Sequence, residues 1–528
     1  MNLSLRVACC FFAPALFGLL AAGSAPSQAA QGYRVTGILT APPGTVVVLK
    51  ERNNQEITVT AKTDGNLRLT QTPFVFPKEV PNGSIYSVSI HRAEANLVCA
   101  VTKNGEGMVD GASPVVYVVG DLSADLASRS TDDKTRGTFY ETAAPAIGGK
   151  GGDDGRYVAF VSYAAGLDGS TGKKRQVFWR DRHTGVTKLI SSSAAGGEGN
   201  GDSGAPAISA DGRSVAFESY ATNLVPIDTN NVRDVFVWNA DTNTVTSVSD
   251  APGGIEANAE AYEPTISGDG KLVAFTSSAS SLTSDVDGTS QPNVFLKDLS
   301  SGSVTLISRD EKTRKAGGGS RPSMSEDGSR IAFYNYAPLL DTDKNGLWDI
   351  YLWERGGQKL KRLSMTSEGG ERAQGDESAS RIVRPAISGN GKFVTFATTA
   401  GNVVPYDNNK VQDVFIVDVD TLRISRLSLD NNAEEGDADT PVGQGEKASL
   451  SHDAKWIVFT TSSKRFGGGV VMKNLVTGEM RVVAPAPGTA VGRPEISREG
   501  GYVAFGTSEK LDPRFPSSGI FVRFIAGR

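Results

Sequence analysis

Oxygen-bearing side chains recur at alternate positions in one short segment, Asp341-Thr-Asp343-Lys-Asn345-Gly346-Leu-Trp-Asp349. This order of oxygen ligands, with glycine at the sixth position, matches the start of a calcium-binding loop. A hard cation takes six to eight oxygen ligands, and a tight loop can turn alternate side chains toward one point. Leu352 stands where such a loop carries its bidentate Glu. A neighbouring loop or water would therefore have to complete the shell.

Two related segments follow the same pattern, with Asp228, Asn230 and Asp234 in one and Asp407, Asn409 and Asp413 in the other. A further segment, Asp285-Val-Asp287 with Asn293, is longer and less regular. The alternative is that these are Asx turns whose last Asp begins the next strand. Both interpretations stay open. A bound Ca²⁺ would stiffen a loop, since nothing nearby suggests an activated water.

Histidine is scarce, with three in the chain, His91, His183 and His452. Because they fall in turns of a repeat or in a separate domain, we expect no histidine metal centre. Ser451-His452-Asp453 has the composition of a catalytic triad. However, adjacent residues on a hairpin point in different directions, and the repeat accounts for both Ser and Asp. We therefore predict no catalytic residue and no nucleotide-binding loop.

The elements that must position these residues come from an internal repeat, roughly Pro-x-Ile-Ser-x-Asp-Gly-x-x-Val-Ala-Phe. Clear copies begin at Pro206, Pro264, Pro322 and Pro385. A first copy with a glycine-rich insertion begins at Pro145, and weaker copies occupy 447–459 and 494–505. In most copies a third apolar run, a turn and a fourth run ending in Leu-Ser, Ile-Ser or Val-Ser follow. Each unit therefore predicts four short strands joined by turns.

A four-stranded sheet of this kind cannot bury both of its faces alone, whereas several packed side by side can. We therefore predict an all-β protein with a seven-bladed β-propeller, six blades being the alternative. The last copy lacks a fourth run, and the segment 123–130 resembles the fourth run at 304–310. We expect 123–130 to complete the last blade and close the ring, so that the propeller spans 123–528.

The repeated phrase and its order resemble the TolB-like family of bacterial β-propellers over roughly residues 123–528. The resemblance implies a propeller fold and no particular activity, because propellers carry unrelated functions. TolB is usually described with six blades and another N-terminal domain, so its role in the Tol-Pal system is not carried over.

Residues 31–120 alternate apolar and polar residues between turns, which predicts a small β-sandwich. This part resembles a bacterial surface repeat that has one Cys near Cys99 and a second in its last strand. Here the last strand, 115–119, has no Cys. We therefore expect no disulfide and a buried Cys99.

Residues 1–29 have the pattern of a Sec-type signal peptide, with Arg6 before an apolar stretch and Ser27-Gln28-Ala29 as cleavage site. We therefore expect a periplasmic or secreted protein without a transmembrane anchor. The 528 residues hold 54 Lys and Arg against 59 Asp and Glu. This balance argues against nucleic acid as a partner. The basic run 359–362 alternates like a strand, and we expect a solvated face there.

Two function classes remain. The first is a monomeric, non-enzymatic binding or scaffold protein with a protein or glycan partner on a propeller face. The second is a secreted hydrolase or lyase acting on polysaccharide or peptide. Repeat-breaking acidic, His or Arg residues meeting at one end of the channel would favour the enzyme. Such deviations occur in the last copies, at Arg465, Arg493, Glu495 and Arg498. The regularity of the repeat favours the binding protein.

Overall fold

The computed structural model describes residues 32–41, 45–62, 70–93, 97–122, 125–132, 134–137, 145–286, 291–372, 384–440, 448–484, 493–508 and 519–525. Besides one short 3-10 helix, η1 (Gly151–Asp153), the elements there are β-strands. The signal peptide predicted for residues 1–29 lies outside this part of the chain. Across these ranges no helix has the length and apolar character needed to cross a membrane.

The N-terminal unit, residues 32–122, contains two four-stranded sheets that share one apolar core. One sheet has the order β4 (Thr70–Pro81), β1 (Gly32–Ala41), β8 (Val115–Leu122) and β6 (Leu97–Lys103), and the other has β3 (Glu56–Thr60), β2 (Val46–Glu51), β5 (Ile85–Ala93) and β7 (Glu106–Met108). Val35, Leu39, Leu49 and Phe76 are fully buried between them. Cys99 lies in β6, and its side chain is outside what the structure describes.

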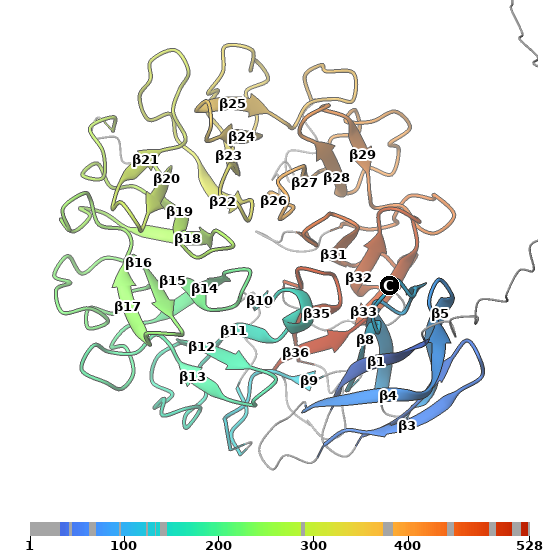
Figure 1. The fold of residues 1–528 in the computed structure, drawn as a ribbon. Helices are drawn as coiled ribbons and strands as arrows, with labels where there is room; N and C mark the ends of the chain where they lie inside the picture. Colours follow the sequence, from blue (N-terminus) through green and yellow to red (C-terminus); the bar gives the residue numbers. More distant parts are fainter. Residues whose placement is uncertain are drawn as a thin grey trace, which may run out of the picture.

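Residues 125–524 form a β-propeller (Figure 1). In the described part of this range, seven four-stranded antiparallel sheets follow one another, and we call them blades 1 to 7 in chain order. Their strands are β10 (Ala146–Gly148), β11 (Tyr157–Ser162), β12 (Gln176–Asp181), β13 (Thr187–Leu189); β14 (Ser203–Ile208), β15 (Ser214–Ser219), β16 (Asp234–Asn239), β17 (Thr244–Ser247); β18 (Ala261–Ile266), β19 (Leu272–Ser277), β20 (Asn293–Asp298), β21 (Val304–Leu306); β22 (Ser320–Met324), β23 (Arg330–Asn335), β24 (Asp349–Glu354), β25 (Lys359–Arg362); β26 (Ala386–Ile387), β27 (Phe393–Thr398), β28 (Asp413–Asp418), β29 (Ile424–Arg426); β30 (Ser449–Leu450), β31 (Trp456–Thr461), β32 (Gly469–Asn474), β33 (Met480–Ala484); β34 (Glu495–Ile496), β35 (Tyr502–Thr507), β36 (Gly519–Phe524) and β9 (Asp125–Leu126). The first strands line the centre, where neighbouring ones contact each other around a closed ring from β10 to β34.

The blades are held together by aromatic residues of their two middle strands. In six blades the Phe that ends Val-Ala-Phe, or its equivalent, faces an aromatic residue of the third strand, with ring centroids 5.5–6.4 Å apart. These pairs are Phe160–Phe178, Phe217–Phe236, Phe275–Phe295, Phe333–Tyr351, Phe396–Phe415 and Phe505–Phe521. Burying two large rings at one cross-strand position contributes several kcal/mol of hydrophobic free energy, roughly 1.5–3 kcal/mol per side chain. The repeat thus encodes an aromatic pair inside each of these six blades.

The Ser at the end of each fourth run has a structural task. Ser249 Oγ accepts a hydrogen bond from the Val235 backbone N–H at 3.0 Å and donates one to Asp234 Oδ1 at 2.6 Å. The same arrangement recurs at Ser364 and Ser428. The Leu-Ser and Val-Ser pairs therefore fasten the fourth strand to the start of the third.

Residues before the first blade supply the outer strand of the last one. β9 pairs antiparallel with β36, with Leu126 opposite Phe521. Ser128 Oγ accepts a hydrogen bond from the Ile520 N–H at 3.0 Å, the role that Ser249 has in blade 2. On the other side, Arg180 of blade 1 donates from Nη1 to the Arg129 carbonyl oxygen at 3.0 Å. This segment therefore joins blade 7 to blade 1.

Basic side chains at one position of the third strand tie several blades to the blade before. Lys297 donates to the Asp250 carbonyl at 2.9 Å, and Lys473 donates to the carbonyls of Leu427 and Leu429 at 2.9 and 2.7 Å. Burial lowers the pKa of Lys473 to about 8. Arg180 and Arg523 occupy the same place in blades 1 and 7.

Candidate functional site

An arginine lies inside the loop that best matched a calcium site. Nη1 of Arg362 is 2.7 Å from Asp343 Oδ1, 3.9 Å from Asp349 Oδ2 and 2.9 Å from Glu371 Oε2. Tyr351 also donates its hydroxyl hydrogen to Asp343. The expectation of a solvated face at 359–362 is therefore wrong for Arg362, which is 6% exposed. Its acidic partners on a neighbouring loop could not be inferred from alternation along one strand.

The 407–413 loop of blade 5 repeats this geometry. Arg426 places Nη1 3.0 Å from Asp407 Oδ1 and 3.6 Å from Asp413 Oδ2, and Nη2 2.8 Å from Glu435 Oε1. Asn409 accepts the Val411 N–H in an Asx turn. In these two loops a guanidinium supplies the positive charge that a cation would bring, so the donor sets do not fit Ca²⁺ as they stand.

Blade 2 has the acidic residues without the arginine. Ser247 pairs with Phe236 in the register at which Arg362 pairs with Tyr351. Asp234 accepts hydrogen bonds from Asn230 and Ser249, at 3.0 and 2.6 Å.

One oxygen of this blade 2 loop, Asp228 Oδ1, is buried without a hydrogen-bond partner. Burial, followed by the charges of Asp234, Glu256 and Asp250, raises the pKa of Asp228 to about 6. Among the described residues no group of three or more His, Cys, Asp or Glu is arranged to hold a metal ion. Calcium at this loop therefore stays a prediction.

Ser451-His452-Asp453 forms a turn that other blades share. Ser451 Oγ donates to Asp453 Oδ1 at 3.1 Å and accepts the Trp456 N–H at 3.1 Å. Ser209 with Asp211, and Ser267 with Asp269, make the same contact. His452 instead lies with Nδ1 2.9 Å from Glu326 Oε1 of blade 4. These three consecutive residues thus do not form a triad.

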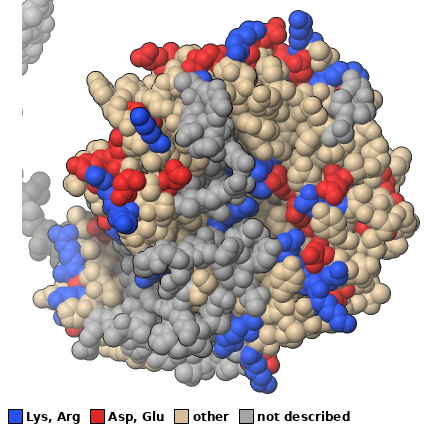
Figure 2. Space-filling model, turned by 180° about the vertical axis from the view of Figure 1, so that it is seen from behind, with Lys and Arg blue, Asp and Glu red and all other residues tan. Residues whose placement is uncertain are grey.

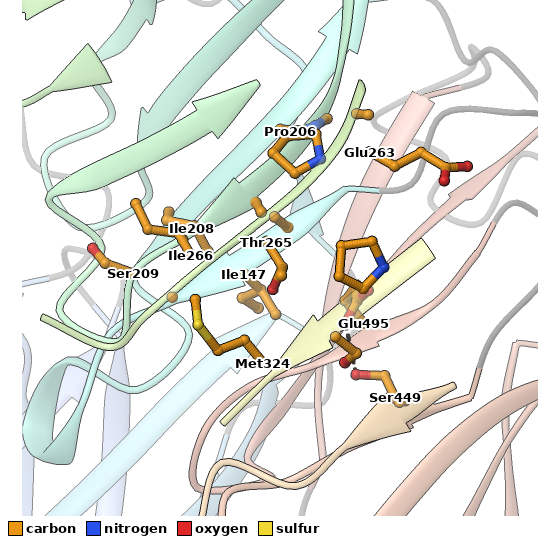
Figure 3. A pocket seen from close by; sticks show the side chains of 18 of the residues that line it. Ile147, Pro206, Ile208, Ser209, Glu263, Thr265, Ile266, Met324, Ser449 and Glu495 are labelled. Carbon is orange, nitrogen blue, oxygen red and sulfur yellow. Dashed lines mark hydrogen bonds between the residues drawn. The ribbon is translucent and has the colours of Figure 1, made fainter. Parts of the chain in front are cut away.

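A cavity of about 540 Å³ occupies the central channel. It is lined by the first strands and their turns, including Ile147, Ile208, Thr265, Ile266 and Met324, which Figure 3 labels. Its charged lining residues are Arg175, Glu218, Arg233, Glu263, Arg321, Glu326, Arg384, His452, Arg493, Glu495 and Arg498. Six Arg against four Glu leave a positive excess of two in a chain whose net charge is −5.

One end of the channel, which we call the arginine mouth, is formed by the residues just before the repeated prolines. Ala205, Glu263 and Arg321 hold this position in blades 2 to 4 with φ of 47°, 55° and 56°. At each of them the pairing of the first and second strands is interrupted by a bulge. A non-glycine residue in this region costs about 1–3 kcal/mol, which the surrounding sheet must offset. Arg384 and Arg493 hold the same position in blades 5 and 7.

Ion pairs connect these residues across the mouth. Arg384 of blade 5 contacts Glu263 of blade 3, and Arg321 Nε lies 3.6 Å from the same Glu263 oxygen. Burial lowers the pKa of Arg384; the charge of Glu263 opposes this shift, and the nearby charges of Arg493 and Arg321 add to it. Two guanidinium groups therefore share one carboxylate. Such crowding favours an additional anion, because guanidinium pairs readily with carboxylates in bidentate geometry.

A second group flanks the mouth on blades 2 and 3. Arg233 lies 3.3 Å from Glu218 and 3.1 Å from Glu260, and its guanidinium carbon is 4.3 Å from the Tyr262 ring centroid. Tyr220, which is 45% exposed, lies 5.5 Å from the same carbon. Figure 2 shows the face turned away in Figure 1, with Lys and Arg around its central hollow.

The opposite end of the channel is encircled by main-chain hydrogen bonds that pass from blade to blade. The donor and acceptor residues are Gly149 and Ala210, Ala210 and Gly268, Gly268 and Glu326, Glu326 and Gly389, Asn390 and His452, and His452 and Arg498. Asp154 of blade 1 completes the circle by accepting from the N–H groups of Glu499 and Gly501 at 2.9 and 3.2 Å. These bonds join the turns of neighbouring blades, and we call this end of the channel the floor.

A glutamate, a histidine and an arginine meet on this floor. Glu326 Oε1 lies 2.9 Å from His452 Nδ1 and 3.1 Å from Arg498 Nε. A Cβ at Gly389 would lie 2.5 Å from that histidine nitrogen and 2.7 Å from the Glu326 oxygen. Glycine is therefore needed in blade 5 for this contact between blades 4, 6 and 7.

Three of the four repeat-breaking residues noted in the sequence line the channel. Arg493 belongs to the mouth and Arg498 to the floor. Glu495 begins β34 and accepts a hydrogen bond from Ser449 at 2.6 Å (Figure 3). Arg465 instead pairs with Glu434 away from the channel lining. Sequence reasoning missed Arg321 and Arg384, although both precede a repeated proline and break the pattern at that position.

No family model and no curated protein matches the sequence. Solved structures do match. TolB from Acinetobacter baumannii is 18% identical, over 62% of this chain and 66% of TolB, with a TM-score of 0.36. The β-propeller fold of this chain is established by its own ring of four-stranded sheets.

Other propellers are similar to the same degree. An oligogalacturonate lyase from Vibrio parahaemolyticus is 10% identical over 84% of this chain and 98% of the lyase, with a TM-score of 0.47. The propeller domain of the Trilobed protease from Pyrococcus furiosus is 14% identical over 73% of this chain and 96% of the domain, with a TM-score of 0.45. At these identities the similarity concerns the fold, so function must come from the site.

Proposed function

We propose that this chain is an extracytoplasmic binding or scaffold protein that captures an anionic group of a protein or glycan partner at the arginine mouth. The periplasm or the exterior is inferred from the signal-like pattern of residues 1–29. The observation that carries the proposal is the sharing of Glu263 by Arg321 and Arg384. A guanidinium-rich cavity in an acidic protein selects negative charge locally.

The arrangement of charged residues in the channel fits a binding site better than an active site. Charged residues do gather in the channel, as expected of an enzyme, but at the mouth they pair with one another. The His452–Glu326 contact lies on the floor together with Arg498, which holds the same carboxylate. The Glu326 carboxylate is thus already held by Arg498 and faces His452, so both of its neighbours on the floor belong to the chain itself. The arrangement therefore supports a binding site.

The test is calorimetric titration of the mature protein with a poly-L-glutamate oligomer, beside poly-L-lysine of equal length. We expect the acidic peptide to bind, and to bind more weakly as salt rises. Arg321→Gln and Arg384→Gln should each weaken binding by roughly ten- to a hundredfold, since a charge-assisted bond contributes about 1.5–3 kcal/mol.

Arg213→Gln is the matched control, because Arg213 pairs with Asp241 outside the channel lining. Arg321→Lys keeps the positive charge and should lose less affinity than Arg321→Gln. It thereby separates the loss of a charge from a disruption of the fold. Equal binding of both peptides would refute the proposal. Cleavage of a bound polymer would instead establish the enzyme alternative.

A further inference from the structure

A row of aromatic side chains begins at the arginine mouth and extends over blade 4. The guanidinium carbon of Arg321 lies 5.0 Å from the ring centroid of Tyr334. The Tyr334 ring is 4.8 Å from that of Trp348, which is 5.3 Å from that of Tyr336. Trp348 is 36% exposed and Tyr336 55% exposed. An aromatic surface open to solvent is thus continuous with the channel.

Buried contacts hold this row in place. Tyr334 lies in β23, and Trp348 directly precedes β24. Arg372, which is 2% exposed, donates from Nη2 to the Trp348 carbonyl oxygen at 2.8 Å and from Nη1 to Thr398 Oγ1 at 3.3 Å. Because the Trp348 backbone is fixed before any ligand arrives, little ordering entropy is lost on binding.

The chemistry of the row and the mouth together defines a ligand class. The negative face of an aromatic ring attracts the weakly positive C–H groups of a sugar ring. Guanidinium groups take carboxylates. We infer that the arginine mouth and the row Tyr334–Trp348–Tyr336 bind an acidic polysaccharide built of uronic acid residues. This inference rests on the proposed function and narrows its ligand.

An extended peptide fits this surface less well. A peptide that lies along a sheet takes up the hydrogen bonds of a free strand edge. Both strands next to the row are already paired on each side, β23 with β22 and β24, and β24 with β23 and β25. A single glycan chain needs no strand edge, because its ring faces and carboxylates supply the contacts.

The experiment compares three ligands by calorimetry on the full mature protein: hexagalacturonate, its methyl ester and a glutamate hexapeptide. We expect hexagalacturonate to bind at least roughly tenfold more tightly than the uncharged ester. Trp348→Ala and Tyr336→Ala should each weaken hexagalacturonate binding by roughly three- to tenfold and leave the glutamate peptide unchanged.

Tyr406→Ala is the control for loss of an exposed aromatic ring, since Tyr406 is 88% exposed and its carbonyl accepts from Arg426 of the outer strand β29. Trp348→Phe keeps a ring and should retain most of the affinity, which separates stacking from misfolding. Binding of the glutamate peptide without hexagalacturonate would overturn this inference and leave the proposed function standing. Failure of every anionic ligand would overturn both, and full affinity in Trp348→Ala would exclude the row.

Discussion

Arg426 lies with its Nη1 atom 3.0 Å from Oδ1 of Asp407, in a cluster where both side chains are less than a tenth exposed. The same guanidinium reaches Asp413 and Glu435. Three carboxylates of one blade thus depend on one cation that belongs to the chain itself.

Replacing that arginine by the residue that blade 2 carries in its place tests this dependence. Arg426→Ser should destabilise the protein by about 3–5 kcal/mol, because it leaves carboxylates buried and unpaired. Chemical denaturation gives this value. The exposed Arg423→Ser is the control. If added Ca²⁺ recovers part of the loss in Arg426→Ser, the two kinds of cation are interchangeable here, and an unchanged unfolding free energy would show that Arg426 is dispensable.

Asp228 should make stability fall as pH rises. Its pKa in the folded state is about 6, above the ordinary value of 3.8, so the folded protein holds this proton more tightly than the unfolded chain. That stabilisation is complete below about pH 4 and is lost as pH rises through about 6. In EDTA, Asp228→Asn should raise the melting temperature at pH 7 by roughly 1–3 °C and leave it unchanged at pH 4. Asp110 is exposed, so Asp110→Asn should leave the melting temperature unchanged at both pH values. If Asp228→Asn shifted the melting temperature equally at pH 4 and pH 7, this account would be contradicted.

We expect any stabilisation of the protein by Ca²⁺ to come from the Asp228 loop of blade 2. If Asp228, Asp234 and Asn230 bind Ca²⁺, the melting temperature rises with the logarithm of its concentration and returns with EDTA. Mg²⁺ should have less effect, because it demands tighter octahedral geometry. The response should disappear in Asp228→Asn and persist in Asp110→Asn. A flat melt would make this loop an Asx turn like its neighbours.

The closing strand offers a test of the seam between blades 7 and 1. Ser128→Ala removes the acceptor for the buried Ile520 N–H. An unsatisfied buried donor costs about 1–3 kcal/mol. Ser303→Ala removes an exposed serine that bonds to Ser301, and it should change stability little. Equal stability of the two variants would mean that Ser128 does not hold the seam.

Much of the propeller could be predicted from the repeat, because the repeated residues form the same hydrogen bonds in one blade after another. The Ser-x-Asp pair of the repeat, which is Ser209 and Asp211 in blade 2, forms the same turn in other blades. Phe217 lies opposite Phe236 on the neighbouring strand. The site follows less directly. Arg384 and Glu263 are 121 positions apart along the chain, and the ring brings them together. Arg362 looked like a surface residue, since its acidic partners lie on other loops.

The strand β9 has a mechanical consequence for the protein. It begins three positions after β8 of the N-terminal unit ends, and it is also the outer strand of blade 7. A tension applied to the N-terminal unit by a bound partner therefore passes through that short connection into the seam. Its load would fall first on the β9–β36 pairing and on the bonds of Ser128 and Arg129. The place where the ring closes is thus also where a pull would begin to open it.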